Sequence, residues 1–243
     1  MNALNIVLLA GKKTEHPLTD DEYPEYLSEC DGKALIHSLI DNCATLDPAR
    51  IICMFPSSDI SRFHLRNMAQ QMHPAATVLP TYSATKGAAC TALLASEQID
   101  NDDELLILST NDMLDVSLEK IVRTFRENTD DAGVVIFKSL HPRYSFVRLN
   151  EDDQVVEAAE KNPISSHAIA GMYWFKSGSL FVSAAKDMIR KDARVNNSFF
   201  IAPVLNELVL RHKKIGAHRI EATQYHPLKN QSQLQAFESG GAR

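Results

Sequence analysis

Cysteine is scarce in this 243-residue chain, and no two cysteines are closely spaced. The four, at positions 30, 43, 53 and 90, form no Cys-x-x-Cys pair. The sequence therefore predicts neither a zinc site nor a disulfide framework. Free thiols of this kind are typical of a reducing compartment and favour a cytoplasmic location.

Long apolar runs and an excess of positive charge are also lacking. No stretch approaches the roughly 18 to 20 apolar residues that a membrane span needs, and the first apolar run is too short for a signal peptide and has no basic flank. The 25 Lys and Arg against 31 Asp and Glu give a net charge of −6 that is spread along the chain. We therefore expect a cytoplasmic protein that does not bind membranes and has no broad nucleic-acid-binding surface.

Short apolar runs alternate with helical patterns through the first half of the chain. The runs predict strands over 5–10, 50–55, 77–79, 104–109 and 133–139, and the patterns between them predict helices over 34–43, 61–71, 87–99 and 116–128. This rhythm predicts an α/β fold with a mostly parallel Rossmann-like sheet and helices on both faces.

Shorter extended pieces follow, and they predict a mixed extension of the same sheet. We expect strands over 145–149, 155–160, 168–175 and 214–220, and helices over 177–191, 199–211 and 231–237. Ser177 or Ser179 can cap the first of these helices. The whole chain, 1–243, is predicted to be a single domain.

The predicted central strand 104–109 ends in Thr110-Asn111-Asp112. In open α/β sheets ligands gather at the carboxyl ends of the strands, so Asp112 stands where chemistry is expected. Its carboxylate is the kind of oxygen ligand that Mg²⁺ prefers. The alternative is a cap for the following helix, a role for which Asp115 is better placed.

Several segments, by their order and spacing, together resemble the nucleotidyltransferases that activate sugar phosphates. The closest likeness is to short members of bacterial surface-polysaccharide pathways, and the resemblance spans nearly the whole chain. The matching segments are 6–11 (IVLLAG), 22–27 (EYPEYL) with 31–36 (DGKALI), 85–94 (TKGAACTALL), 105–112 (LLILSTND), 156–164 (VEAAEKNPI) with 167–175 (HAIAGMYWF), 195–204 (VNNSFFIAPV) and 226–234 (HPLKNQSQL).

The resemblance implies a fold related to glycosyltransferase A and a Mg²⁺-dependent reaction. A nucleoside monophosphate would pass from an NTP to a phosphorylated sugar, polyol or small alcohol, with release of pyrophosphate. Residues from about 1 to 140 would form the nucleotide side, and residues from about 141 to 243 the substrate side. Since similar folds often dimerise, the resemblance also allows a homo-oligomer.

On the nucleotide side, the resemblance implies that Leu9, Ala10 and Gly11 open a phosphate loop. The loop departs from the family, because Lys13 replaces the second glycine and no Arg follows. The family's lysine after proline is Glu25 here, and its carboxylate would repel a triphosphate. Lys12 or Lys13 would then supply the missing positive charge; the alternative is a basic pair on a solvated turn.

The family pattern also implies contacts to the nucleobase from Lys86, Gly87 and Ala88, where a glycine allows a close approach of the backbone. The alternative is packing of small residues within a helix.

On the substrate side, the resemblance implies that Glu160 holds hydroxyl groups and Lys161 holds the substrate phosphate, although an exposed ion pair explains the spacing equally well. Gly171 matches a position where the backbone approaches the substrate. Asn111 and Asn196 are expected at the same pocket.

Two features leave other functions open. The second metal carboxylate of many family members is absent from 222–225, and the phosphate loop is eroded. A degenerate member that binds a ligand or partner without turnover is therefore the main alternative. A glycosyltransferase A-type enzyme is another, although Thr110-Asn111-Asp112 supplies only part of its Asp-x-Asp motif.

Overall fold

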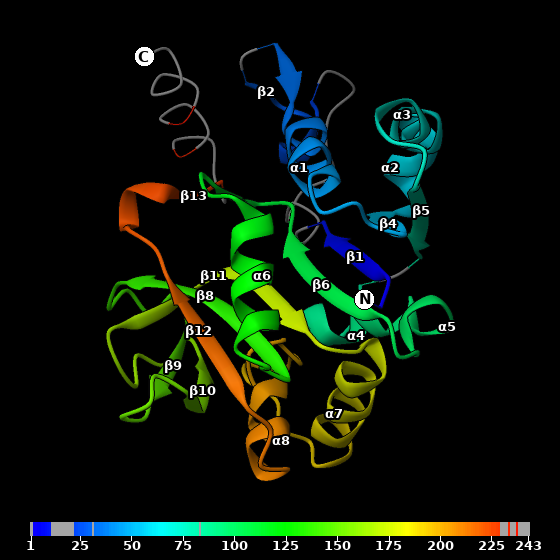
Figure 1. Ribbon diagram of the computed structural model, residues 1–243. Helices are drawn as coiled ribbons and strands as arrows, with labels where there is room; N and C mark the ends of the chain where they lie inside the picture. The colour runs from blue at the N-terminus through cyan, green and yellow to red at the C-terminus, as the bar shows by residue number, and fades with distance from the viewer. Residues whose placement is uncertain are drawn as a thin grey trace.

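The computed structural model describes residues 2–10, 22–30, 32–82 and 84–228, together with Gln233 and Phe237. Within these residues the main sheet has nine strands (Figure 1). They are β1 (Leu4–Leu9), β4 (Arg50–Pro56), β5 (Ala76–Thr81), β6 (Glu104–Ser109), β8 (Ala132–Lys138), β9 (Ser145–Leu149), β10 (Val155–Glu160), β11 (His167–Phe175) and β12 (Ile215–Arg219).

The sheet is parallel where the nucleotide side was predicted and mixed beyond it. Strands β6, β1, β4 and β5 lie side by side and parallel. Strand β11 then runs antiparallel to β6 and to β8, and β9 pairs antiparallel with β10. The predicted α/β fold, with a mostly parallel sheet and a mixed extension, is confirmed.

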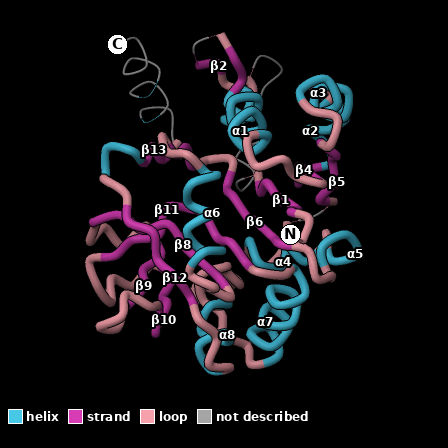
Figure 2. Tube along the Cα trace, in the orientation of Figure 1, coloured by secondary structure: helices cyan, strands magenta, loops and turns pink. Residues whose placement is uncertain are grey.

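Helices cover both faces because the strands are apolar on both sides. In β1, Ile6 and Leu8 join one core and Val7 and Leu9 join the other. The first core takes in α1 (Leu35–Ala44), α3 (Leu65–Met72) and α6 (Leu118–Glu127), and the second takes in α4 (Ala88–Leu93), α7 (Gly178–Arg190) and α8 (Val204–Leu210) (Figure 2). None of the helices in the described residues has the length and apolar character that crossing a bilayer requires.

Three predicted helices differ from the structure. The helix predicted over 61–71 is two helices, α2 (Ser57–Arg62) and α3, because His64 adopts a left-handed conformation with φ of 52° between them. The helix predicted over 87–99 is α4 followed by α5 (Ser96–Ile99). The helix predicted over 199–211 begins only at Val204, because the Phe199 backbone bonds to residues 86 and 89 instead.

The helix caps agree with the predictions only in part. Ser177 caps α7 as predicted, by accepting a hydrogen bond from Leu180 N. The α6 cap is Ser117 rather than Asp115, because the Ser117 hydroxyl accepts from Lys120 N. Of the helix predicted over 231–237, only Gln233 and Phe237 lie within the described residues.

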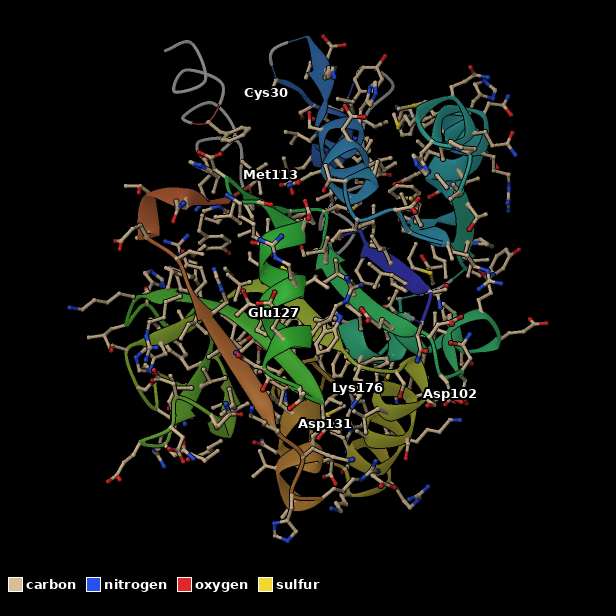
Figure 3. The ribbon with its side chains drawn as sticks, viewed as in Figure 1. Cys30, Asp102, Met113, Glu127, Asp131 and Lys176 are labelled. Atoms are coloured by element: carbon tan, nitrogen blue, oxygen red, sulfur yellow. The ribbon has the colours of Figure 1, made fainter. Side chains whose placement is uncertain are left out.

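A small ribbon that the sequence did not predict ties the C-terminal part to the strand end that carries Asp112. Its strands are β7 (Asp112–Leu114) and β13 (Tyr225–Pro227), which pair antiparallel. Met113 of this ribbon packs on a small apolar cluster of Cys30, Leu35 and Leu228. Figure 3 labels Met113 and Cys30 of this group. The position of Asp112 therefore depends on both ends of the described chain.

A buried carboxylate anchors α6 to the sheet. Glu104 at the start of β6 is 7% exposed and accepts hydrogen bonds from Arg126 Nε at 2.9 and 3.0 Å, from Arg126 Nη2 at 2.8 Å and from Trp174 Nε1 at 3.0 Å. A buried charge is costly unless it is paired and hydrogen-bonded. These donors offset that cost and fix α6 against β6 and β11.

Replacing Arg126 by alanine should lower the free energy of unfolding by about 2–3 kcal/mol, because it leaves Glu104 with an uncompensated buried charge. Urea denaturation measures this change. The matched control is Arg123→Ala on the same helix, whose 3.8 Å ion pairs to Glu119 and Glu127 are exposed and whose loss should cost less than about 1 kcal/mol. Equal losses in the two variants would refute the anchoring role of Glu104.

Candidate functional site

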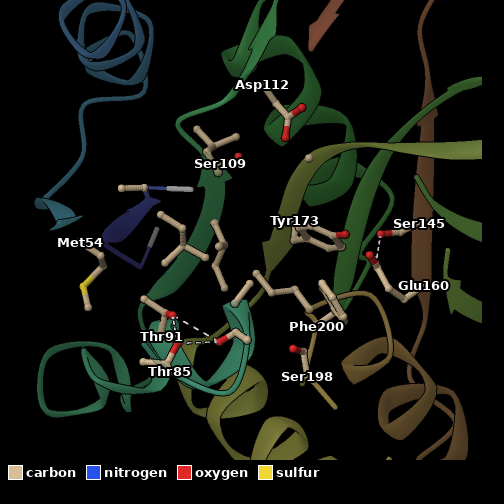
Figure 4. A pocket seen from close by; sticks show the side chains of 18 of the residues that line it. Met54, Thr85, Thr91, Ser109, Asp112, Ser145, Glu160, Tyr173, Ser198 and Phe200 are labelled. Atoms are coloured by element: carbon tan, nitrogen blue, oxygen red, sulfur yellow. Dashed lines mark hydrogen bonds between the residues drawn. The ribbon is translucent and has the colours of Figure 1, made fainter. Parts of the chain in front are cut away.

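A cavity of about 460 Å³ opens at the carboxyl ends of the parallel strands. One side is lined by Leu9, Ala10 and Met54 and by the segment around Gly87, and the other by residues of β9, β10 and β11. Figure 4 shows Met54, Thr85 and Thr91 opposite Ser145 and Glu160, with Asp112 above them. The cavity is thus lined both by residues from the predicted nucleotide side of the chain and by residues from its predicted substrate side.

Close backbone packing shapes the side of the cavity at Gly87. This glycine has φ of +116°, and a Cβ here would overlap the Phe199 carbonyl. Phe199 N donates to Lys86 O at 2.6 Å, and Ala89 N donates to Phe199 O at 3.0 Å. The Thr85 and Thr91 hydroxyls are 2.6 Å apart and lie 3.2 and 3.3 Å from the Gly87 carbonyl oxygen. These bonds hold the segment in place without a long helix.

Asp112 is the buried carboxylate of the cavity. It is 7% exposed, and its Oδ1 accepts a 2.5 Å hydrogen bond from the Tyr225 hydroxyl. Burial, and then the nearby carboxylate, raise the pKa of Tyr225 above its ordinary value, so the hydroxyl remains a hydrogen-bond donor to Asp112 even in alkaline solution. Gly171, with φ of +71°, lies directly behind the carboxylate: a Cβ there would lie 2.6 Å from Oδ2.

A second buried carboxylate, Glu160, lies on the opposite wall. It is 8% exposed and accepts a hydrogen bond from the Ser145 hydroxyl, its cross-strand partner between β9 and β10. Burial raises the pKa of Tyr173, and the Glu160 charge raises it further. Since hydroxyl groups bond well to a buried carboxylate, this wall suits a ligand that carries such donors.

Two exposed cations border the same wall. Lys161 has φ of 56°, and its Nζ lies 5.0 Å from the centre of the Phe200 ring. The Arg143 guanidinium lies 5.3 Å from the centre of the Tyr144 ring. The Lys161 N–H donates to the Tyr144 carbonyl at 3.0 Å, which links the two segments. Both cations line the cavity and suit an anionic group at its opening.

Glu25 lies near the metal candidate without lining the cavity. Asn111 Nδ2 donates to Glu25 Oε2 at 2.9 Å, and Asn111 Oδ1 accepts from the Thr110 hydroxyl at 3.1 Å. Burial raises the pKa of Glu25. The carboxylate that replaces the family lysine is thus held by the residue next to Asp112.

The structure brings most of the predicted site residues together. The cavity is lined by Leu9, Ala10, Gly87, Ala88, Asp112, Glu160, Lys161 and Gly171. The lining does not include Lys86, Asn111 or Asn196. Gly11, Lys12 and Lys13 lie outside the described residues.

The three predicted residues that do not line the cavity have other places. Lys86 contributes its carbonyl to the Phe199 bond, and the Asn111 side chain serves Glu25 and Thr110. Asn196 adopts a left-handed conformation with φ of 48°, in a turn closed by hydrogen bonds between Val195 and Ser198. The segment after this turn instead presents Ser198 and Phe200 to the cavity.

Sequence reasoning missed the aromatic and hydroxyl side chains of the cavity. They include Tyr82, Tyr144, Ser145, Tyr173, Ser198 and Tyr225, and the Arg143 guanidinium was missed as well. The pairing of Ser145 with Glu160 depends on strand register, and that of Tyr225 with Asp112 joins residues 113 positions apart. Neither has a local sequence signal.

The described residues contain no group of three or more His, Cys, Asp or Glu side chains that could hold a metal ion. A metal ion at Asp112 would therefore have this carboxylate as its one protein ligand among the described residues. This donor set fits Mg²⁺, which keeps several waters and takes further oxygens from substrate phosphates.

A mostly parallel α/β sheet with a cavity at its strand ends, lined in part by carboxylates and cations, is the arrangement in which doubly wound folds bind nucleotides and similar ligands. The chain matches the nucleotidyl transferase family over residues 4–221 and belongs to that family.

The chain is also similar to individual proteins of known sequence or structure. The UTP–glucose-1-phosphate uridylyltransferase AglF of Haloferax volcanii is 25% identical over 176 residues, which is 70% of each chain. The nucleoside-diphosphate-sugar pyrophosphorylase of Vibrio cholerae RC9 superposes with a TM-score of 0.81 at 19% identity, over 96% of this chain and 99% of that one. A UDP-glucose pyrophosphorylase complexed with UDP-glucose gives 0.79 at 14% identity, over 99% and 98%. The solved structures share the fold.

Replacing Gly171 by alanine should reduce nucleotidyl transfer on the order of 100-fold, because the new Cβ displaces Asp112 and a misplacement of about 1 Å is costly. The matched control is Gly32→Ala: Gly32 also has a positive φ, of 74°, but a Cβ there meets nothing within 4 Å. Both variants should lose about 1–2 kcal/mol of stability from the left-handed backbone. Equal transfer rates in the two variants would show that the position of Asp112 does not matter.

Proposed function

We propose that the protein transfers a nucleoside monophosphate from an NTP to the phosphate of a phosphorylated sugar, polyol or small alcohol, with release of pyrophosphate. An acceptor phosphate oxygen attacks the α-phosphorus of the NTP. The new P–O bond joins acceptor and nucleoside monophosphate, and the bond to the bridging oxygen breaks, so that this electron pair leaves with pyrophosphate.

One observation carries the proposal: the same cavity is lined by the ends of the parallel strands and by Glu160, Lys161 and Gly171. Transfer between two phosphates requires both substrates in one site, since positioning supplies most of the rate. We assign residues from about 1 to 140 to the NTP and residues from about 141 to 243 to the acceptor.

Asp112 would hold Mg²⁺, which neutralises charge on the phosphates when bound. The carboxylate is buried and its orientation is fixed by the Tyr225 hydroxyl and the Gly171 backbone. A ligand held in this way needs little reorganisation when its metal and the phosphates arrive.

The acceptor would lie against the wall formed by β9, β10 and β11. Lys161 and Arg143, both exposed at the cavity, would bind its phosphate by charge. Glu160, held by Ser145, would accept hydrogen bonds from acceptor hydroxyls. The predicted roles of Lys12 and Lys13 on the triphosphate belong to this proposal as well.

The test is pyrophosphate release with Mg²⁺, each common NTP and a panel of phosphorylated sugars, polyols and small alcohols. Release should require one NTP and one acceptor, and Asp112→Asn should lower it on the order of 100-fold or more. The control is Asp115→Asn, an exposed carboxylate in the same segment, which should leave the rate unchanged. Release that is independent of Asp112 would contradict the assigned role. Release of a nucleoside diphosphate from a sugar nucleotide would instead identify a glycosyltransferase.

A second candidate function, binding without turnover, is favoured by the position of Glu25. Its carboxylate hydrogen-bonds Asn111, next to Asp112, and adds negative charge on the side that should receive a triphosphate. Like charges at close range in a partly shielded site repel by a kcal/mol or more.

The substitution Glu25→Lys should therefore strengthen NTP binding about tenfold, because it replaces a repulsion by an attraction. Isothermal titration with each NTP measures the change. Glu29→Lys makes the same charge change at an exposed position of the same segment and should have a smaller effect. If Glu29→Lys strengthens binding equally, overall charge and not the site is responsible. Turnover that appears only in the Glu25→Lys variant would favour the second candidate for the wild type.

A further inference from the structure

Tyr82 stands at the apolar side of the cavity. It directly follows Thr81, the last residue of β5, which pairs with Pro56 at the end of β4. Leu9 of β1 is in turn paired with Met54 of β4. These strand ends are neighbours in the sheet, and Leu9, Met54, Pro56, Thr81 and Tyr82 all line the cavity.

The Tyr82 ring is unlike the other tyrosines of the cavity. It is 83% exposed, whereas Tyr144, Tyr173 and Tyr225 are at most 8% exposed. The buried tyrosines are occupied with ring contacts or hydrogen bonds to neighbours. Among the described residues, Tyr82 makes no hydrogen bond, ion pair or ring contact. Its ring is therefore largely exposed and has no ring partner among the described residues.

The charges of the cavity lie away from Tyr82 in the fold. The charged lining residues are Asp112, after β6, and Arg143, Glu160 and Lys161, on the segments around β9 and β10. Figure 4 shows Met54 and Glu160 on opposite sides. Among the described residues, the lining around Tyr82 carries no charged side chain and is largely apolar, which suits a planar aromatic group there.

We infer that Tyr82 stacks on the nucleobase of the bound NTP and covers it on the solvent side, with the strand ends at Leu9 and Met54 beneath. The inference rests on the proposed function and adds the residue that distinguishes a nucleotide from a bare triphosphate. Every base has a π-face, so stacking favours a base without choosing among bases. Base choice then falls to the backbone edges near Gly87.

The test is isothermal titration of the full chain with Mg²⁺ and each common NTP, with inorganic tripolyphosphate as the base-free probe. Tyr82→Ala should weaken binding of the preferred NTP about 5- to 150-fold, the range found when a stacked aromatic is removed, and leave tripolyphosphate binding unchanged. Tyr82→Phe keeps the ring and should stay within about twofold of the wild type. The matched control is Tyr23→Ala, which removes another exposed tyrosine, one that packs on Phe63 and does not line the cavity.

Each outcome decides a separate question. Unchanged NTP affinity in Tyr82→Ala, with normal binding by the wild type, overturns the stacking role alone. An equal loss for NTP and tripolyphosphate also overturns it, because the effect would then act on the phosphates or on the fold. A loss in Tyr82→Phe as large as in Tyr82→Ala would assign the effect to the hydroxyl instead of the ring. If the wild type binds no NTP, the proposed function itself fails.

Discussion

The hydrogen bond from the Tyr225 hydroxyl to Asp112 joins the parts of the chain on which the site depends. Asp112 follows the central strand β6, Tyr225 lies in the C-terminal ribbon, and Gly171 of β11 closes the space behind the carboxylate. Burial raises the pKa of Tyr225, which extends the pH range over which the phenol can donate this bond. In this chain a hydroxyl from a distant segment orients the carboxylate.

Backbone contacts join the two sides of the cavity in the same way. Residues 86 and 89 hydrogen-bond to the backbone of Phe199, next to Ser198 and Phe200 of the cavity lining. Because main-chain bonds leave little freedom, the apolar side and the charged side keep a fixed spacing. That spacing is what a reaction between two bound phosphates requires.

The charge of the described cavity is unevenly distributed. Its cations, Arg143 and Lys161, both lie on the side assigned to the acceptor, and Glu25 lies near Asp112 where the family carries a lysine. Among the described residues, the cations that line the cavity thus lie on the proposed acceptor side. The proposed stacking on Tyr82 would add affinity for the nucleotide that does not depend on phosphate charge.

The sequence by itself determined the α/β class and the placement of Asp112 at the end of a central strand, whereas Glu160, Lys161 and Gly171 were implied by the resemblance to the family. Strands and helices carry local apolar periods, and ligands gather where parallel strands end, so both follow from short segments. The split at His64 and the late start of α8 were not predictable, because tertiary contacts override local propensity there. Only the tertiary structure decided the bonds of Ser145 to Glu160, of Tyr225 to Asp112 and of Phe199 to the Gly87 segment. Such pairs are set by strand register and by packing between residues far apart in the chain, and no local pattern records them.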